Sequence, residues 1–161
     1  MSEFQNSRRI RKYLVFKLND AFYGVPLSKV KEVIGLPQCV EIPNSPSYFL
    51  GLINLRGKVI TAIDLKQKLG IRSGASPSKR PAVILTECQT ATIGCVVDSV
   101  SEVLSIDDAN VEKPSGSGQE AQTHIRGIAK FSDRNMILLV DLEEAADIAS
   151  FFHVPHQSSA S

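Results

Sequence analysis

Arg56 is the residue whose type and position most clearly suggest a chemical role, the binding of a carboxylate. It stands with Gly57 in the middle of GLINLRGKVITAIDL, residues 51–65, where apolar residues run up to the pair and return from it. This pattern predicts a β-hairpin with a tight turn that holds one guanidinium at its exposed end. A planar guanidinium can pair with a carboxylate through two hydrogen bonds. Two simpler interpretations stay open, a solvated turn residue and an internal pair with a carboxylate such as Glu32.

The histidines and cysteines do not form the patterns that metal binding needs. Only two of the histidines are close in sequence, no acidic residue stands near that pair, and the cysteines lack the paired spacing of a zinc site. We therefore expect no bound metal, and cysteines that stay reduced. The residues concerned are His124, His153, His156, Cys39, Cys88 and Cys95.

Catalytic motifs are missing as well. The stretches GASPSKR and GSGQEA lack the lysine spacing and the following helix of a phosphate-binding loop, and no nucleophile elbow occurs. Glu32 and Glu102 could imitate a catalytic carboxylate pair, but they stand at equivalent places in an internal repeat, which favours a shared structural role. The sequence predicts neither an enzyme nor a cofactor.

Composition excludes several kinds of partner. The 161 residues are 43% hydrophobic and 22% charged, typical of a globular protein, and 18 basic against 17 acidic residues leave a net charge of +1. No overall field attracts nucleic acid or anionic lipid. The basic start of the chain does not resemble a signal peptide, and no run is long enough to span a membrane, so we expect a cytoplasmic protein without direct membrane insertion.

Strand periodicity and turn residues predict an all-β fold with short helices. Asp64 and Asp141 each stand where a helix N-cap belongs, with Gln67 and Glu144 three residues later as capping partners. The expected segments are a disordered N-terminus (1–12), a hairpin (13–25), a short helix passing into a strand (26–34), a proline-rich loop (35–49), a hairpin and capped helix (51–70), a mobile basic loop (73–81), strands within 82–97 and 100–106, a loop (113–123), a strand and C-terminal helix (136–150) and a frayed tail (151–161).

An internal repeat organises these elements. A shift of 70 residues places one GxxxxxVxEV unit on another, and later segments match at offsets of 76 and 77. The matched positions in the first unit are Gly24, Val30, Glu32 and Val33, and in the second Gly94, Val100, Glu102 and Val103. We infer two similar lobes, formed by repeats at roughly 13–72 and 82–150 and packed or interlocked with pseudo-symmetry.

The repeat also helps to separate scaffold from function. Features present in both copies most economically serve folding, whereas features in one copy are candidates for function. The tip around Arg56 is matched in the second copy by an ordinary polar turn, Lys130 to Asn135. Arg56 is therefore specific to the first copy.

Taken in order, YGVPLSKVKEVIG, IPNSPSYFLGLINLRGKVITAIDL, IGCVVDSVSEVLSI and a terminal strand followed by Asp-Leu and a helix resemble the CheW-type chemotaxis coupling proteins. The resemblance covers residues 13–150. It implies two interlocked five-stranded, SH3-like β-barrels with no cofactor and no catalysis. It also implies a cytoplasmic scaffold, recruited to membrane-associated receptor arrays, that joins chemoreceptor tips to the histidine kinase CheA.

The same resemblance implies a set of partner-binding positions. They are Val30, Glu32 and Val33 in the first VxEV unit, Gly51 before the hairpin, Asn54 and Arg56 in the NLRG element, and Gly94 and Val103 in the second unit. Because Val30 and Val33 are three residues apart, they would face opposite sides of a strand, and one of them should be exposed.

Two other functions stay open at this point. The chain could serve a pilus or surface-sensing pathway of the same type instead of swimming chemotaxis. From a different class, a small β-barrel could bind single-stranded nucleic acid, which would need a basic groove with interleaved aromatic residues.

Overall fold

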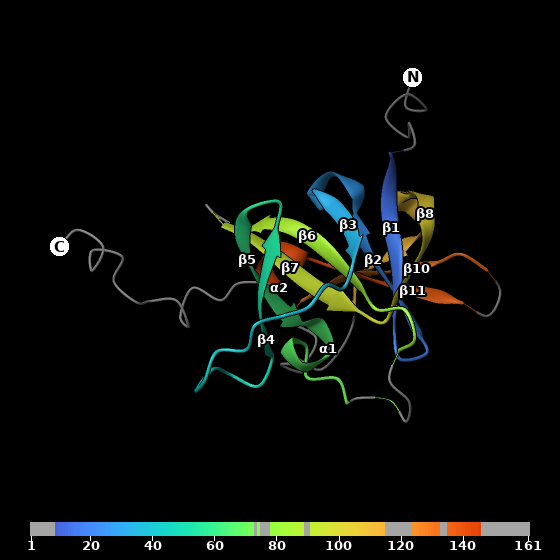
Figure 1. Cartoon of the computed structure of the whole chain (residues 1–161). Coiled ribbons are helices and arrows are strands. Elements are labelled where there is room, and N and C mark those ends of the chain that lie inside the picture. The colour runs from blue at the N-terminus through green and yellow to red at the C-terminus, as the bar shows by residue number, and fades with distance from the viewer. Residues whose placement is uncertain are drawn as a thin grey trace, which may run out of the picture.

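Two curled β-sheets make up most of the molecule, and short helical turns connect them (Figure 1). The structure is a computed structural model and describes residues 9–72, 74, 78–88, 91–114, 124–132 and 135–145. The predicted all-β fold with short helices is confirmed. The strands are β1 (Ile10–Leu18), β2 (Ala21–Pro26), β3 (Glu32–Gly35), β4 (Phe49–Leu55), β5 (Lys58–Asp64), β6 (Ala82–Cys88), β7 (Ala91–Val97), β8 (Ser99–Asp107), β9 (Val111–Glu112), β10 (Ile125–Lys130) and β11 (Met136–Val140). The helical turns are η2 (Leu27–Lys29), α1 (Leu65–Lys68), η3 (Asp108–Asn110) and α2 (Leu142–Ala145).

Each sheet takes strands from both sequence repeats. The six-stranded sheet has the order β8-β1-β2-β11-β10-β9, and the five-stranded sheet has the order β3-β6-β7-β5-β4. The first hairpin of each repeat therefore joins strands of the other repeat. The repeats are interlocked, and neither repeat builds a sheet by itself. The sixth strand, β9, is only two residues long and is the one addition to the expected five.

Strand register confirms the internal duplication residue by residue. Gly24 in β2 pairs with Leu139 of the parallel strand β11, and Gly94 in β7 pairs with Ala62 of the parallel strand β5. Both sheets also contain a register shift, in β4 just before Gly51 and in β10 between Ile125 and Gly127. These positions are related by the offsets seen in the sequence, so the two sheets repeat one design.

The core has three parts. One apolar cluster lies within each curled sheet, and a third, larger cluster lies between the sheets. Strand β1 contributes to two of them, because Tyr13 and Val15 point into its own sheet while Leu14, Phe16 and Leu18 point between the sheets. Both faces of this strand are buried, which explains why its sequence has few polar residues.

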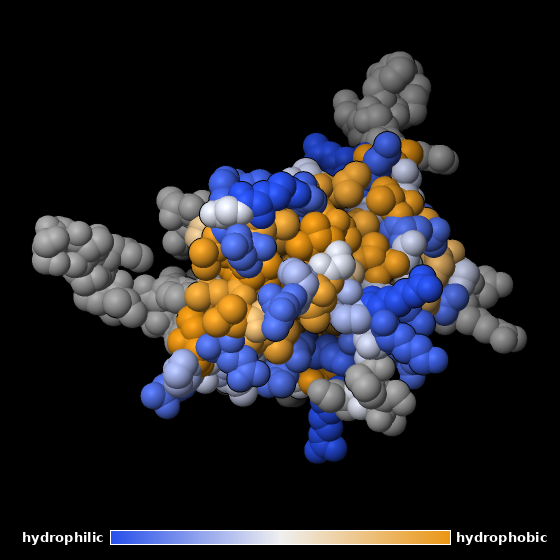
Figure 2. Space-filling view, viewed as in Figure 1, coloured by the Kyte–Doolittle hydropathy of each residue, from blue (hydrophilic) through white to orange (hydrophobic). Residues whose placement is uncertain are grey.

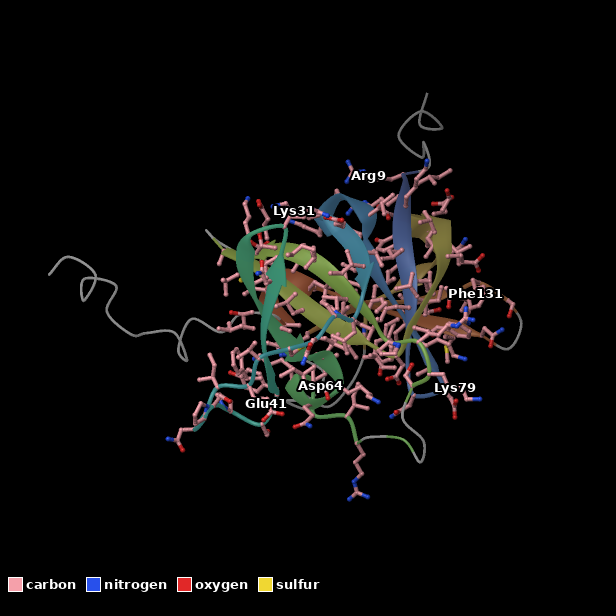
Figure 3. All side chains as sticks on the ribbon, viewed as in Figure 1. Arg9, Lys31, Glu41, Asp64, Lys79 and Phe131 are labelled. Carbon is pink, nitrogen blue, oxygen red and sulfur yellow. The ribbon has the colours of Figure 1, made fainter. Side chains whose placement is uncertain are left out.

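The predicted helix caps are present. The Asp64 carboxylate accepts a hydrogen bond from the backbone N–H of Lys66 at 3.1 Å, one residue earlier than Gln67, the position expected from the sequence. Figure 3 shows Asp64 at the start of α1. Asp141 accepts from the N–H of Glu144 at 3.0 Å, as the sequence predicted. Gly70, with φ of +78°, ends the first helix.

Strand β1 begins at Ile10 and not at Tyr13, because β8 is long enough to pair with it as far as Asp107. The rest of the predicted disordered N-terminus lies outside the described residues. So do residues 115–123 of the predicted loop, the C-terminal helix beyond Ala145, and the tail with His153 and His156.

Candidate partner-binding surface

The first VxEV unit lies on a short connection between the two sheets. Pro26 ends β2 and, with φ of −54°, leads into the turn η2. Val30 has extended backbone angles, φ −95° and ψ 120°, and the chain continues into β3. This is the predicted passage from a helical turn into a strand. Val30 is half-buried against the core cluster between the sheets.

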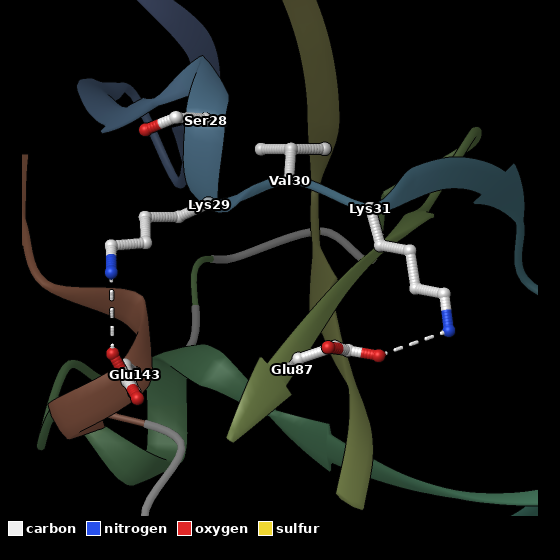
Figure 4. Close-up of a pocket in the computed structure, with 6 residues that line it drawn as sticks. All are labelled: Ser28, Lys29, Val30, Lys31, Glu87 and Glu143. Atoms are coloured by element: carbon white, nitrogen blue, oxygen red, sulfur yellow. Dashed lines mark hydrogen bonds and ion pairs between the residues drawn. The ribbon is translucent and has the colours of Figure 1, made fainter. Parts of the chain in front are cut away.

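A hollow of about 500 Å³ opens beside Val30 (Figure 4). Two ion pairs border it, Lys29 Nζ to Glu143 Oε1 at 3.5 Å and Lys31 Nζ to Glu87 Oε2 at 3.2 Å. All four side chains are exposed, so these pairs contribute little stability and can exchange partners. The sequence did not reveal this hollow, because Glu87 and Glu143 come from distant strand and helix elements.

Strand β3 exposes its second residue. Val33 is 39% exposed, whereas Ile34 packs against the cluster within the five-stranded sheet. The prediction that one of Val30 and Val33 faces solvent holds, with Val33 as the exposed residue. As β3 is an edge strand, Val33 lies beside unpaired backbone groups as well as solvent.

Arg56 forms the internal ion pair that the sequence left open. Its Nη2 lies 2.5 Å from Oε1 of Glu32, and the Arg56 side chain is 68% exposed. The two residues come from opposite edges of the same sheet, since β3 and β4 are its outer strands. The pair therefore spans the curl of the sheet. The hydrogen bond to Glu32 raises the pKa of Arg56 further, so the guanidinium stays charged in water.

Turn geometry at the hairpin tip is demanding. Arg56 has φ of +52° and Gly57 has φ of +85°, the conformation of a type I′ turn. The side-chain oxygen of Asn54 accepts a hydrogen bond from the Gly57 N–H at 3.1 Å. Asn54 thus holds the turn, and a role toward a partner would act through the position of Arg56.

Two predicted site glycines are buried within the sheets. A Cβ at Gly51 would lie too close to the Val40 carbonyl oxygen, and a Cβ at Gly94 would meet Val83 Cγ1 at 2.7 Å. Neither glycine offers a side chain or a surface. Any effect of these positions on binding would be indirect, through the sheets.

The second VxEV unit presents an equivalent surface on the other sheet. Val103 in the edge strand β8 is 46% exposed and pairs with Leu14, just as Val33 pairs with Ile84. Val100 packs against the cluster between the sheets, as Val30 does. The structure therefore brings Glu32 and Arg56 together, places Val30 and Val33 on the same segment as Glu32, and places Val103 at the equivalent edge of the six-stranded sheet.

Further exposed apolar residues extend the surface of the five-stranded sheet. Val59 on β5 is 69% exposed, Val40 is 66% exposed, and Leu36 follows β3. Figure 2 shows apolar residues over much of the face that carries β3 and the β4–β5 hairpin. The sequence does not distinguish Val59 from its buried neighbour Ile60, because both are apolar. Val40 lies in a proline-bounded loop, where no periodicity indicates exposure.

This surface is suited to binding rather than to covalent chemistry. Among the described residues, no group of three or more His, Cys, Asp or Glu side chains could hold a metal ion. Burial raises the pKa of Cys95 to about 12, so this thiol is a poor nucleophile. No helix within the described ranges is long and apolar enough to cross a membrane.

Aromatic side chains do not form a platform for nucleic-acid bases. Of the described aromatic residues, Phe131 alone is exposed, and its ring packs edge-on against Phe22. Figure 3 shows Phe131 at the side of the molecule, well apart from Glu41. The interleaved basic groove that single-stranded nucleic acid would need is therefore not present in these ranges.

Comparisons with known proteins agree on one family. A family model described as the CheW-like domain matches residues 12–150. The chain is 34% identical over 134 residues to a "Probable chemotaxis protein CheW" from Rhizobium etli, covering 83% of this chain and 85% of that protein. It is 33% identical over 135 residues to a "Chemotaxis protein CheW" from Klebsiella aerogenes, covering 83% and 80%.

The fold agrees with a solved structure. The crystal structure of the scaffolding protein TtCheW from Thermoanaerobacter tengcongensis superposes with a TM-score of 0.77 at 34% sequence identity. The match covers 87% of this chain and 94% of that chain.

Proposed function

The chain belongs to the CheW-like domain family, and we propose that it is an adaptor that couples chemoreceptors to a CheA-type histidine kinase. It acts in the cytoplasm, at receptor arrays, and performs no catalysis. The arrangement of β3 and the β4–β5 tip carries this proposal. An exposed valine, an exposed arginine held by a carboxylate, and an open strand edge form a recognition surface on one rigid sheet.

Receptor binding is assigned to the surface around Val33, Glu32 and Arg56. Val33 supplies apolar area at a sheet edge, and Arg56 supplies guanidinium donors that Glu32 does not use. Arginine and apolar anchors dominate the energy of many protein interfaces. An acidic side chain of the receptor could pair with Arg56 while an apolar side chain covers Val33.

Kinase binding is assigned to a different part of the five-stranded sheet. Val40 and Val59 are the most exposed of the apolar residues there; Val40 bridges Leu52 in the edge strand β4, and Val59 lies in the neighbouring strand β5. An adaptor must hold two partners at once, so each partner needs its own contact area. In this assignment the hairpin tip with Arg56 meets the receptor, and the positions of Val40 and Val59 meet the kinase.

The experiment measures binding of the full chain to a receptor signalling-tip fragment and, separately, to the kinase regulatory domain. Arg56→Asn is the central variant, because asparagine tolerates positive φ and Asn-Gly suits a type I′ turn. Loss of the guanidinium should weaken receptor binding roughly 5- to 150-fold while the melting temperature does not fall. Arg56→Lys should restore part of the affinity, because it keeps the charge and loses the planar fork.

Arg80→Gln is the matched control, an exposed arginine on another segment that forms no ion pair with the described residues. Val59→Ser should weaken kinase binding and spare receptor binding. Equal receptor affinity for wild type and Arg56→Asn would remove Arg56 from the interface. Failure of both fragments to bind the wild-type chain would overturn the coupling function. Binding of the wild-type chain to oligonucleotides that weakens as the salt concentration rises would favour the nucleic-acid alternative.

A further inference from the structure

A second hollow, of about 450 Å³, lies at the six-stranded sheet and meets the hollow beside Val30 at Lys29. Its walls come from β1, the end of β2, η2, η3, β9, β10, β11 and the start of α2. Apolar side chains, among them Leu139, Val111 and Leu142, form part of the lining, and basic side chains border it. The volume lies within the range of small-molecule sites in proteins.

Several hydrogen-bond donors around this hollow are uncommitted. Arg126 contacts Asp141 at 3.2 Å and Glu144 at 3.0 Å, both through Nη2, which leaves Nε and Nη1 without an acceptor in the described part of the chain. Arg11 contacts Asp108 through Nε alone, at 3.5 Å. Lys113 also lines the hollow and forms no ion pair with a described residue.

The Tyr13 hydroxyl adds a further donor. Tyr13 lines the hollow, is 6% exposed, and its hydroxyl has no hydrogen-bond partner among the described residues. Burial raises the pKa of Tyr13, so the hydroxyl keeps its proton and can donate.

Three basic residues of this hollow have no basic counterpart at the equivalent positions of the five-stranded sheet. At the equivalent places of the other sheet, Pro81 stands for Arg11, Ser99 for Lys29 and Leu50 for Arg126. Leu50 packs against the apolar cluster of its sheet, whereas Arg126 is exposed at the hollow. Folding of the sheet therefore does not require an arginine at this position.

Acidic groups nearby limit which ligands fit. Asp108 and Asp141 line the hollow. Glu143 forms an ion pair with Lys29, and Glu144 forms one with Arg126. A compact, highly charged anion such as phosphate would meet these carboxylates. A single carboxylate on an apolar body can meet the free donors of Arg126 and Lys113 while its body covers Leu139.

We propose that this hollow binds an organic monoanion, a carboxylate attached to an aromatic or branched apolar body. The occupant is a free small molecule, because no acidic side chain of a protein carries an aromatic or branched apolar body. The inference does not rest on the coupling function, because Arg126, Lys113 and Tyr13 are not among the residues assigned to receptor or kinase binding.

The test uses the full chain labelled with ¹⁵N and ¹³C-methyl groups, titrated with 2-naphthoate and, in parallel, with neutral 2-naphthamide. Saturable shifts should appear at Tyr13, Leu139 and Val111, and the amide should bind at least about tenfold more weakly, because a charged acceptor strengthens hydrogen bonds. Arg126→Leu, which copies the residue of the other sheet, and Lys113→Gln should each weaken naphthoate binding by a similar factor. Arg80→Gln should leave it unchanged.

Lys113→Gln keeps the test decisive if Arg126→Leu disturbs α2, since Lys113 is exposed and forms no ion pair with the described residues. Equal binding of acid and amide, shifts centred elsewhere, or no saturable shift at millimolar naphthoate would each overturn the proposal. Competition of naphthoate with the receptor or kinase fragment would make the hollow a contact area for that partner and would overturn the proposal. Simultaneous binding of naphthoate and both fragments would identify a free ligand.

Discussion

Replacement of Gly51 by alanine should destabilise the five-stranded sheet, although the family resemblance placed this glycine among partner-binding positions. Gly51 has φ of +145°, a conformation that side chains rarely adopt. A Cβ there would lie within van der Waals overlap of the Val40 carbonyl oxygen and 3.3 Å from Cys39 Cβ. The Val40 carbonyl belongs to a bridge with Leu52, with N···O distances of 2.9 and 2.8 Å.

The expected cost follows from these contacts. An unfavourable φ costs about 1–3 kcal/mol. The overlap forces the Val40 carbonyl to move, which weakens two hydrogen bonds worth about 0.5–1.5 kcal/mol each. Together these effects lower the free energy of unfolding by about 2–6 kcal/mol, or roughly 5–20 °C in melting temperature for a domain of this size.

Gly35→Ala is the matched control, because a Cβ at Gly35 would meet nothing within 4 Å and its φ is ordinary. Its free energy of unfolding should stay unchanged or rise by up to about 1 kcal/mol. Urea unfolding followed by circular dichroism measures both variants. If Gly51→Ala unfolds at the wild-type urea concentration, the argument is refuted, and a loss of receptor binding without a loss of stability would instead make Gly51 part of the interface.

Three further outcomes are expected. Asp64→Ala and Asp141→Ala should each lower the free energy of unfolding by about 0.5–2 kcal/mol, because each carboxylate accepts a hydrogen bond from a helix N–H; equal thermal melts would contradict the caps. Val33→Ala should change stability by less than about 0.5 kcal/mol and weaken receptor binding, measured by calorimetry, since the side chain is 39% exposed at a sheet edge; wild-type affinity would exclude Val33 from the interface. Burial raises the pKa of Cys95 from 9.0 to about 12, so its contribution to stability is complete below pH 9 and is lost as pH rises toward 12; a urea midpoint that stays constant over this range, or rapid thiol labelling of Cys95 in the folded protein, would show that the thiol is not buried.

Local features of this fold were accessible from the sequence. The hairpin tip at Arg56-Gly57, the caps at Asp64 and Asp141 and the exposure of one of Val30 and Val33 depend on neighbours within a few positions. Turn chemistry and alternation report such features directly. The repeat also predicted that Glu102 and Val103 would lie where Glu32 and Val33 lie, and the registers of β3 and β8 agree.

Features that depend on the curl of a sheet were not accessible. The sequence named Glu32 as one possible partner of Arg56 but could not decide between this pair and a solvated arginine, because the approach of β3 to the β4–β5 tip depends on the curl of the sheet. The structural role of Gly51 depends on the loop residue Val40, whose placement no periodicity reveals. The hollow beside Val30 needs Glu143 from the other end of the chain.

The hairpin tip itself argues that Arg56 serves binding rather than folding. A type I′ turn would be more favourable with asparagine or glycine at position 56, because arginine at φ of +52° strains the backbone. The ion pair with Glu32 does little to offset this strain, since exposed pairs are screened by water. A residue that costs stability where two better choices exist is retained for another property, and stabilising replacements at such positions commonly cost function. Arg56→Asn should therefore melt at or above the wild-type temperature and bind the receptor fragment less tightly, and a variant that melts lower while binding equally well would show that the arginine is part of the scaffold.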